Sequence, residues 1–143
     1  KFQNDLGADC LMCLDDLPKH GTIKNEVIES LRRTHLWAER CKKSYDGKGL
    51  LFGIIQGSDF KDLREKSAKF IDSLNFDGIS IGGLCIGEGR EKMFEMTRIC
   101  KENVSRDKPL YLMGVGSPED IIKAIDLGVD IFDSKFPAEI ARR

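Results

Sequence analysis

The sequence has no long hydrophobic run, no cysteine pattern typical of disulfides and no excess of charge of either sign. No apolar stretch approaches the ~20 residues that a membrane-spanning helix needs. Residues 1–9 also lack the apolar stretch that follows the charge of a secretory signal peptide. The five cysteines are odd in number and scattered, which disfavours a disulfide framework. These absences predict a cytoplasmic protein that makes no membrane contact.

The charge balance does not select a partner. The 23 basic and 24 acidic residues give a net charge of −1, whereas a strongly basic domain would have indicated phosphate contacts directly. Any surface that binds nucleic acid must therefore come from local clusters. Hydrophobic residues make up 41% and charged residues 33% of the 143 positions, which is the usage of one ordinary globular domain with its own core.

Short apolar runs alternate with amphipathic helical patterns along the whole sequence. The runs are almost continuously hydrophobic, as in parallel strands buried on both faces, and predict strands at 8–14, 50–56, 78–83, 109–115 and 129–133. Helices are expected at 22–43, 61–74, 90–104 and between a Ser-Pro cap at 117–118 and a glycine stop at 128. This alternation predicts an α/β fold with parallel strands. A doubly wound sheet and a partial eight-stranded barrel both remain open.

Each predicted strand ends in polar residues or glycines that a purely structural strand would not need. These residues are Asp15-Asp16, Gln56-Gly57, Gly82-Gly83, Gly114-Val115-Gly116 and Asp133. In α/β barrels the active site forms at the carboxyl ends of the strands and takes residues from several of them. The pattern therefore predicts one mouth lined by carboxylates, an amide and exposed backbone.

Asp133 is the candidate catalytic residue. It follows an apolar run, and a carboxylate at a strand end can act as a nucleophile, a base or a metal ligand. For an isolated aspartate, a helix N-cap is the more usual role. The other strand-end residues reverse that preference.

The remaining strand-end residues suit a flat polar ligand. Asp15 or Asp16 could accept hydrogen bonds from the ring N–H and exocyclic amine of a purine, although a solvated turn before Pro18 would explain both. Gln56 suits the edge of a base, and Gly82-Gly83 would let the backbone approach it closely. Residues 114–120 lead into a helix N-terminus, a natural phosphate site whose field Glu119 and Asp120 would partly cancel.

No metal site is predicted in this sequence. Cys10 and Cys13 have a spacing found in metal sites, but they lie inside a predicted strand without a second Cys/His pair nearby, which favours buried small residues. His20 and His35 are isolated and are expected to be surface or helix residues.

Four stretches, at 51–57, 81–88, 111–120 and 128–134, resemble successive motifs of the tRNA-guanine transglycosylases. They occur in the order of the family, and the resemblance extends over essentially the whole chain. It implies a (β/α)₈ TIM barrel, of which residues 1–143 would form a partial catalytic domain, roughly the C-terminal half. Enzymes of this family exchange guanine at the wobble position of certain tRNAs for a 7-deazaguanine base.

The resemblance assigns roles residue by residue. Asp133 matches the nucleophile that forms a covalent intermediate with RNA, and Asp15 matches the carboxylate that reads the base together with Gln56 and Gly83, beside Gly82. The carbonyl of Leu84 matches a contact to a substituent of the incoming base, and Met113 matches a wall of the stacking slot. The expected RNA-binding residues are Gly114, Val115, Gly116, Ser117, Pro118, Glu119, Asp120 and Arg142.

The sequence also departs from the family pattern. The general acid/base aspartate of the family belongs to an earlier segment, and its structural zinc site of three cysteines and a histidine lies beyond the nucleophile, so no cofactor is expected within this chain. Bacterial members place a Thr-Arg-x-x-Arg run after the nucleophile, of which only Arg142 is kept, with Glu139 reversing the charge. Leu17 replaces a cysteine or valine. Ile86 resembles enzymes that use the small prequeuosine base rather than queuine.

These departures leave two alternatives to an active tRNA-modifying enzyme. The chain could belong to a non-catalytic tRNA-binding subunit or degenerate paralogue, within a homodimer or beside a complementing subunit, or to a relative that inserts deazaguanines into DNA. Five strands of an eight-stranded barrel would also have open edges. Residues 1–143 alone are therefore expected to be poorly soluble or inactive.

Overall fold

The computed structural model describes residues 2–142 and contains one sheet of five parallel strands. The strands are β1 (Cys10–Met12), β2 (Leu50–Ile55), β3 (Gly78–Ile81), β4 (Leu110–Leu112) and β5 (Ile131–Phe132). The helices are α1 (Phe2–Asp5), α2 (Lys24–Ser44), α3 (Lys61–Ser73), α4 (Arg90–Glu102), α5 (Pro118–Asp126) and α6 (Phe136–Ala141). The predicted alternation of strands and helices is confirmed.

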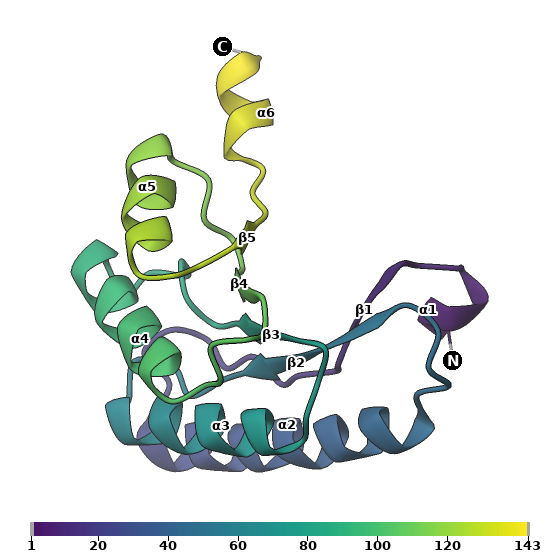
Figure 1. Cartoon of the computed structure of the whole chain (residues 1–143). Coiled ribbons are helices and arrows are strands. Elements are labelled where there is room, and N and C mark those ends of the chain that lie inside the picture. The colour runs from purple at the N-terminus through teal and green to yellow at the C-terminus, as the bar shows by residue number, and fades with distance from the viewer. Residues whose placement is uncertain (1, 143) are drawn as a thin grey trace.

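The strand order decides between the two architectures that the sequence left open. Spatial order follows chain order, β1-β2-β3-β4-β5, and helices α2 to α5 lie along one side of a curled sheet (Figure 1). A doubly wound sheet would reverse its order at a switch point and carry helices on both faces. The chain therefore forms a half-barrel, a partial TIM barrel of the α/β class.

The core lies between the sheet and the helical layer. Ile55, Ile71, Ile81 and Leu112 are fully buried there, and each such side chain stabilises the fold by roughly 1.5–3 kcal/mol. Gly53 shows how tight the packing is, because a Cβ at this position would lie 2.6 Å from Ile71 Cγ2. This packing holds the carboxyl ends of β2 and β3 in place.

Helix α5 has the boundaries that the sequence predicts. The hydroxyl of Ser117 accepts the backbone N–H of Asp120 at 3.2 Å, and Pro118 occupies the first turn. Beyond its end, Gly128 takes a left-handed conformation with φ +86 and donates its N–H to the carbonyl of Ile125. The loop from β4 therefore enters α5 in a defined direction.

β4 and the two outer strands are shorter than predicted, and residues 109–115 yield only Leu110–Leu112. Residues 8–14 yield only Cys10–Met12, and residues 129–133 yield only Ile131–Phe132. β1 ends at Met12 although its neighbour β2 continues to Ile55, whereas β5 ends at Phe132, opposite the last residue of β4. The short helices α1 and α6 were not predicted, because four and six residues are too few for a helical periodicity to be visible.

Apolar side chains are exposed near both outer strands. Leu14 follows β1 and is 63% exposed, while Ile131 in β5 is 38% exposed. Within residues 2–142, β1 and β5 each pair along one edge only, which agrees with the expected open edges. The same residues contain no helix with the length and apolar character needed to cross a membrane.

Candidate active site

Asp15 and Gln56 come together at the carboxyl ends of β1 and β2. The side-chain Nε2 of Gln56 donates to Asp15 Oδ2 at 2.6 Å. Gln56 is 1% exposed, whereas Asp15 is half-buried. A carboxylate only accepts hydrogen bonds, so Asp15 orients the amide of Gln56 with its nitrogen toward the carboxylate.

Asp16, the other member of the acidic pair, faces helix α2 instead. Its carboxylate bonds to Arg33 Nε at 2.5 Å, its backbone N–H donates to Thr34 Oγ1 at 2.9 Å, and its carbonyl accepts from Ser30 Oγ at 2.6 Å. These contacts fasten the loop after β1 to the helical layer. Asp15 is therefore the carboxylate available to a ligand.

Gly82 and Gly83 lie directly against the amide of Gln56. A Cβ at Gly82 would lie 2.7 Å from Gln56 Nε2, and a Cβ at Gly83 would overlap Gln56 Oε1. Gly83 also has φ +68, a conformation that favours glycine. Asp15, Gln56, Gly82 and Gly83 thus form one group, the glycine–amide cluster.

The glycine–amide cluster contains a buried acceptor that lacks a donor. Gln56 Oε1 has no hydrogen-bond partner among the described residues. An unpaired buried polar atom costs about 1–3 kcal/mol, and native proteins rarely leave one without a reason. This atom marks a place where a polar ligand or a water molecule would be stabilised.

Arg64 of α3 braces the cluster from behind and was not singled out in the sequence. Its side chain is fully buried and donates to the carbonyls of Ser58 at 2.6 Å, Gly82 at 2.6 Å and Gly83 at 3.0 Å. Burial lowers the pKa of this guanidinium from its usual value. The signal was its position four residues before Ala68, on the stripe that α3 buries.

The loop after Gly83 is held by Glu88, a second residue that the sequence analysis did not select. Its carboxylate accepts the backbone N–H of Cys85 at 2.5 Å and of Ile86 at 3.0 Å. Cys85 has φ +63, which is unusual for a residue with a side chain. Leu84 is buried at the base of this loop, and Ile86 is 41% exposed at its tip.

Asp133 lies directly after β5 with an exposed carboxylate. Its Oδ1 accepts the hydroxyl of Tyr111 at 2.6 Å and the backbone N–H of Gly114 at 3.1 Å. Asp133 does not cap α6, since the N-cap of that helix is Lys135 and the N–H of Phe136 bonds to Ser134 Oγ. The alternative role as a helix cap is therefore wrong.

Tyr111 is the partner of Asp133 that sequence reasoning missed. Burial and the hydrogen bond to Asp133 raise the pKa of Tyr111 to about 12. Tyr111 therefore keeps its proton and remains a donor to the carboxylate at neutral pH. Its place in β4, paired with Ile131 of β5, brings it beside Asp133. Tyr111, Gly114 and Asp133 form a second group, the Asp133 cluster.

The loop between β4 and α5 lies beside the Asp133 cluster. A Cβ at Gly116 would overlap the side chain of Ser134, so this glycine allows the loop to pack against the residue after Asp133. The side chain of Val115 is buried in the core. Arg90 of α4 pairs with Glu119 at 3.1 Å and with Asp120 at 2.7 Å, which offsets the two acids at the start of α5.

Both clusters lie at the carboxyl end of the sheet. Gly114 of the Asp133 cluster approaches Cys85 of the loop after β3, since a Cβ on Gly114 would lie 3.6 Å from Cys85 Cβ. Met113 is half-buried just before Gly114. Among residues 2–142 no hydrogen bond joins Asp133 to Asp15 or Gln56. Arg142, at the end of α6, is exposed.

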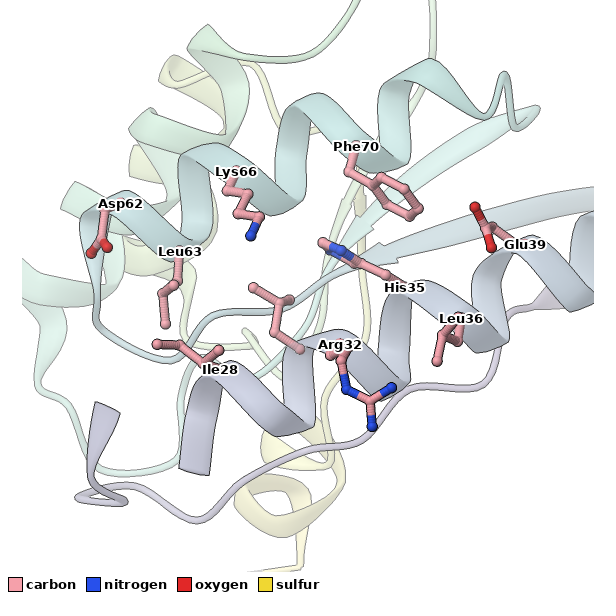
Figure 2. Close-up of a pocket in the computed structure, with 10 residues that line it drawn as sticks. Ile28, Arg32, His35, Leu36, Glu39, Asp62, Leu63, Lys66 and Phe70 are labelled. Carbon is pink, nitrogen blue, oxygen red and sulfur yellow. The ribbon is translucent and has the colours of Figure 1, made fainter. Parts of the chain in front are cut away.

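A hollow of about 520 Å³ lies on the helical side, between α2 and α3 (Figure 2). None of the strand-end residues lines it. Across this hollow His35 stacks on Phe70 with ring centroids 4.1 Å apart, and His35 Nε2 lies 3.1 Å from Ser67 Oγ. The same hydroxyl accepts the backbone N–H of Gln56 at 3.2 Å. His35 is thus a half-buried helix residue that supports the site from outside.

The described residues do not form a metal site. No group of three or more Cys, His, Asp or Glu side chains within residues 2–142 is arranged to hold a metal ion. Cys13 is buried as expected, but Cys10 is exposed, so the prediction of two buried cysteines is wrong for Cys10.

The parallel strands in chain order, with helices along one side, define the class to which the chain belongs: the α/β barrel proteins. In this class the active site forms at the carboxyl ends of the strands, where the two clusters lie. Comparison with known families identifies the member of this class. The family model described as queuine tRNA-ribosyltransferase matches residues 1–143, and the chain belongs to this family.

Curated relatives agree with this assignment. The chain is 46% identical over 144 residues to the queuine tRNA-ribosyltransferase of Staphylococcus epidermidis, 44% over 142 residues to that of Dehalococcoides mccartyi and 48% over 143 residues to that of Thermotoga petrophila. Each match covers 99% of this chain and 38%, 36% and 39% of the respective relative. The chain thus spans somewhat more than a third of the length of these relatives.

Proposed function

We propose that the chain carries the nucleophile and the base-reading residues of a tRNA-guanine transglycosylase, as part of its catalytic domain. The enzyme would exchange guanine at the tRNA wobble position for a 7-deazaguanine base. The observation that carries this proposal is the exposed carboxylate of Asp133, oriented by Tyr111 and Gly114 at the same end of the sheet as the glycine–amide cluster. Family membership supplies the substrate class.

The first step forms a covalent bond between the protein and RNA. An oxygen of Asp133 attacks the anomeric carbon C1′ of the nucleotide, and the C1′–N9 bond breaks with its electron pair moving to guanine N9. Because Tyr111 and Gly114 both donate to Oδ1, Oδ2 is the oxygen available to attack. The target base must leave its stack to reach the site, and the family's aspartate from an earlier segment would supply the proton that guanine takes.

The second step reverses the first with a different base. The family's aspartate from the earlier segment, deprotonated in the first step, would take the proton of the deazaguanine ring nitrogen as this nitrogen attacks C1′, and the bond to Asp133 breaks with its electron pair returning to the carboxylate. Two displacements at one carbon restore the original configuration and leave the RNA backbone uncut. A carboxylate suits both steps, because it is a competent nucleophile and a good leaving group.

The glycine–amide cluster would read the base. Asp15 can accept the ring N–H and the exocyclic amine of guanine in a charge-assisted pair. The N–H of Gly83 and the second N–H of Gln56 Nε2 would donate to the carbonyl oxygen of the base, while the unpaired Gln56 Oε1 would accept from a water molecule or a donor of the base. From the family resemblance, the carbonyl of Leu84 and the side chain of Met113 would contact the base substituent and the ring face.

The base and RNA preferences follow from the rim of the site. Ile86 narrows the entrance and favours the small prequeuosine base over queuine. The loop at 114–120 and Arg142 would contact tRNA near the target nucleotide, and a second copy of the chain or a complementing subunit would supply further RNA contacts. Zinc would be a structural ion held outside the described residues, and the two steps above do not pass through it.

Trapping of the covalent adduct tests the proposal. The protein expressed from the complete reading frame is incubated with labelled tRNA and free guanine, and the adduct is resolved on a denaturing gel. We expect an adduct that disappears in Asp133→Asn and persists in Asp126→Asn, a matched change at an exposed position of α5. Binding of tRNA without an adduct would indicate a non-catalytic subunit, and competition by DNA instead of tRNA would indicate a DNA-modifying relative.

A further inference from the structure

Arg64 carries a charge into the core without a direct ion pair, and only the more distant carboxylates of Glu88 and Asp59 favour that charge. No Asp or Glu among residues 2–142 forms an ion pair with its guanidinium. Its partners are four backbone carbonyls, those of Ile55, Ser58, Gly82 and Gly83. Burying a charge without an ion pair costs folding free energy. A neutral residue at this position would avoid that cost, so the hydrogen bonds of Arg64 must serve a purpose besides stability.

Two of these contacts determine where the backbone donors of the site point. In a trans peptide the C=O and the following N–H point in opposite directions. Because Arg64 holds the carbonyl of Gly82 at 2.6 Å, the N–H of Gly83 must point away from Arg64. The contact to the Gly83 carbonyl at 3.0 Å fixes the N–H of Leu84 in the same way.

The N–H of Gly83 is a donor without a protein partner. No carbonyl or side chain within residues 2–142 accepts it, and it lies next to the amide of Gln56, whose Oε1 is also unpaired. A hydrogen bond from a guanidinium to a carbonyl also polarises that peptide, which strengthens the opposite N–H as a donor. Arg64 therefore fixes the direction of the Gly83 N–H and also makes it a stronger hydrogen-bond donor.

We propose that Arg64 is a positioning residue for base recognition, which fixes the Gly82–Gly83 peptide so that the Gly83 N–H binds the carbonyl oxygen at C6 of the purine. This inference rests on the proposed function and adds to it a determinant that does not touch the substrate. Helix α3 gives it a rigid base, because Ser67, one turn after Arg64, accepts the backbone N–H of Gln56 at 3.2 Å.

The test compares two bases that differ at a single atom. Guanine and 6-thioguanine share the ring N–H and the exocyclic amine, but sulfur is a much weaker acceptor than the C6 oxygen. Binding of each base is measured by calorimetry on the protein from the complete reading frame. In Arg64→Lys, which keeps the charge but loses the planar fork, we expect about a tenfold loss for guanine, the worth of one hydrogen bond, and less than a threefold loss for 6-thioguanine.

A matched variant separates positioning from general destabilisation. Ile71→Val removes one buried methylene group from the same helix and should lower thermal stability while leaving the ratio of the two affinities unchanged. Equal losses for both bases in Arg64→Lys, or an unchanged guanine affinity, would overturn the proposal. If wild-type protein binds no guanine at all, the proposed function itself fails, and this inference fails with it.

A measurement on the wild-type protein keeps the test open should Arg64→Lys not fold. With ¹⁵N-labelled glycine, the Gly83 amide proton should move downfield when guanine is added and move much less with 6-thioguanine. Guanine binding without a change at Gly83 would refute the role of this donor and therefore of Arg64.

Discussion

The two halves of the site are built in different ways. Gln56 and Gly82 of the glycine–amide cluster are buried, Asp15 and Gly83 are half-buried, and α3 supports the cluster through Arg64 and Ser67. The Asp133 cluster is exposed, follows a strand of two residues and is held by two hydrogen bonds. A recognition site gains from rigidity, because each ordered donor lowers the entropy cost of binding. A carboxylate that bonds to a carbon in one step and leaves it in the next, as proposed for Asp133, needs open access instead.

The largest effect is expected from a substitution in the glycine–amide cluster, which is proposed to recognise the base. Asp15→Asn removes the charge that accepts two donors of the base and should weaken guanine binding about 100-fold. Asp16→Asn is the matched control, because Asp16 is bonded to Arg33 and faces α2; it should change binding less than about threefold. Calorimetry with free guanine measures both variants. Similar losses in the two variants would contradict the division of labour within this acidic pair.

A smaller effect is expected in the catalytic half. Tyr111→Phe removes one of the two donors to Asp133 Oδ1 and should slow adduct formation about tenfold through loss of carboxylate orientation. The affinity for free guanine should stay unchanged, because the glycine–amide cluster is intact. Single-turnover kinetics and calorimetry separate these two effects. Faster adduct formation would show instead that Tyr111 restrains the nucleophile.

The smallest expected effect concerns His35 and the dependence of the unfolding free energy on pH. Burial and nearby Lys66 lower the pKa of His35 from 6.5 to about 4. The unfolded chain therefore binds more protons than the folded one between these values, so stability is lost as the pH falls from 6.5 toward 4. The loss should be about 1–2 kcal/mol once the partial exposure of the ring is allowed for.

Denaturant titrations at several pH values test this expectation. His35→Gln should flatten the dependence of the unfolding free energy on pH between 4 and 6.5, whereas His20→Gln, at an exposed position, should leave it intact. An unchanged slope in His35→Gln would mean that other groups cause the acid sensitivity.

The sequence predicted the strand-end residues well, because parallel strands bring their carboxyl ends to one edge whatever their side chains do. Asp15, Gln56, Gly82 and Gly83 meet for that reason. The strand pattern alone could not separate the roles of Asp15 and Asp16, which only the family resemblance distinguished, since adjacent residues after a strand have no fixed direction. That choice depends on contacts with α2, which lie 14 to 18 residues further along the chain.

Residues that act through others were the hardest to predict. Arg64 looks like one more charge on a charged helix, and Tyr111 looks like one more aromatic in a strand. Their importance comes from long-range pairings, between α3 and the end of β3 and between β4 and the residue after β5. The predicted lengths of the outer strands were wrong as well, because an apolar run shows where a strand can form but not how many of its residues pair with a neighbour.

The glycine pair has a consequence for how base preference can evolve. Even a methyl group at Gly83 would collide with Gln56. Stepwise substitution of this glycine therefore cannot change the base preference. Under the proposed function, variation in the accepted base would instead arise at Leu17 and Ile86, which are 51% and 41% exposed. Substitutions at these two positions would change the size of the opening but leave the hydrogen-bonding groups of the glycine–amide cluster unchanged. A new substrate base would then be accepted when one of these two side chains becomes smaller or larger.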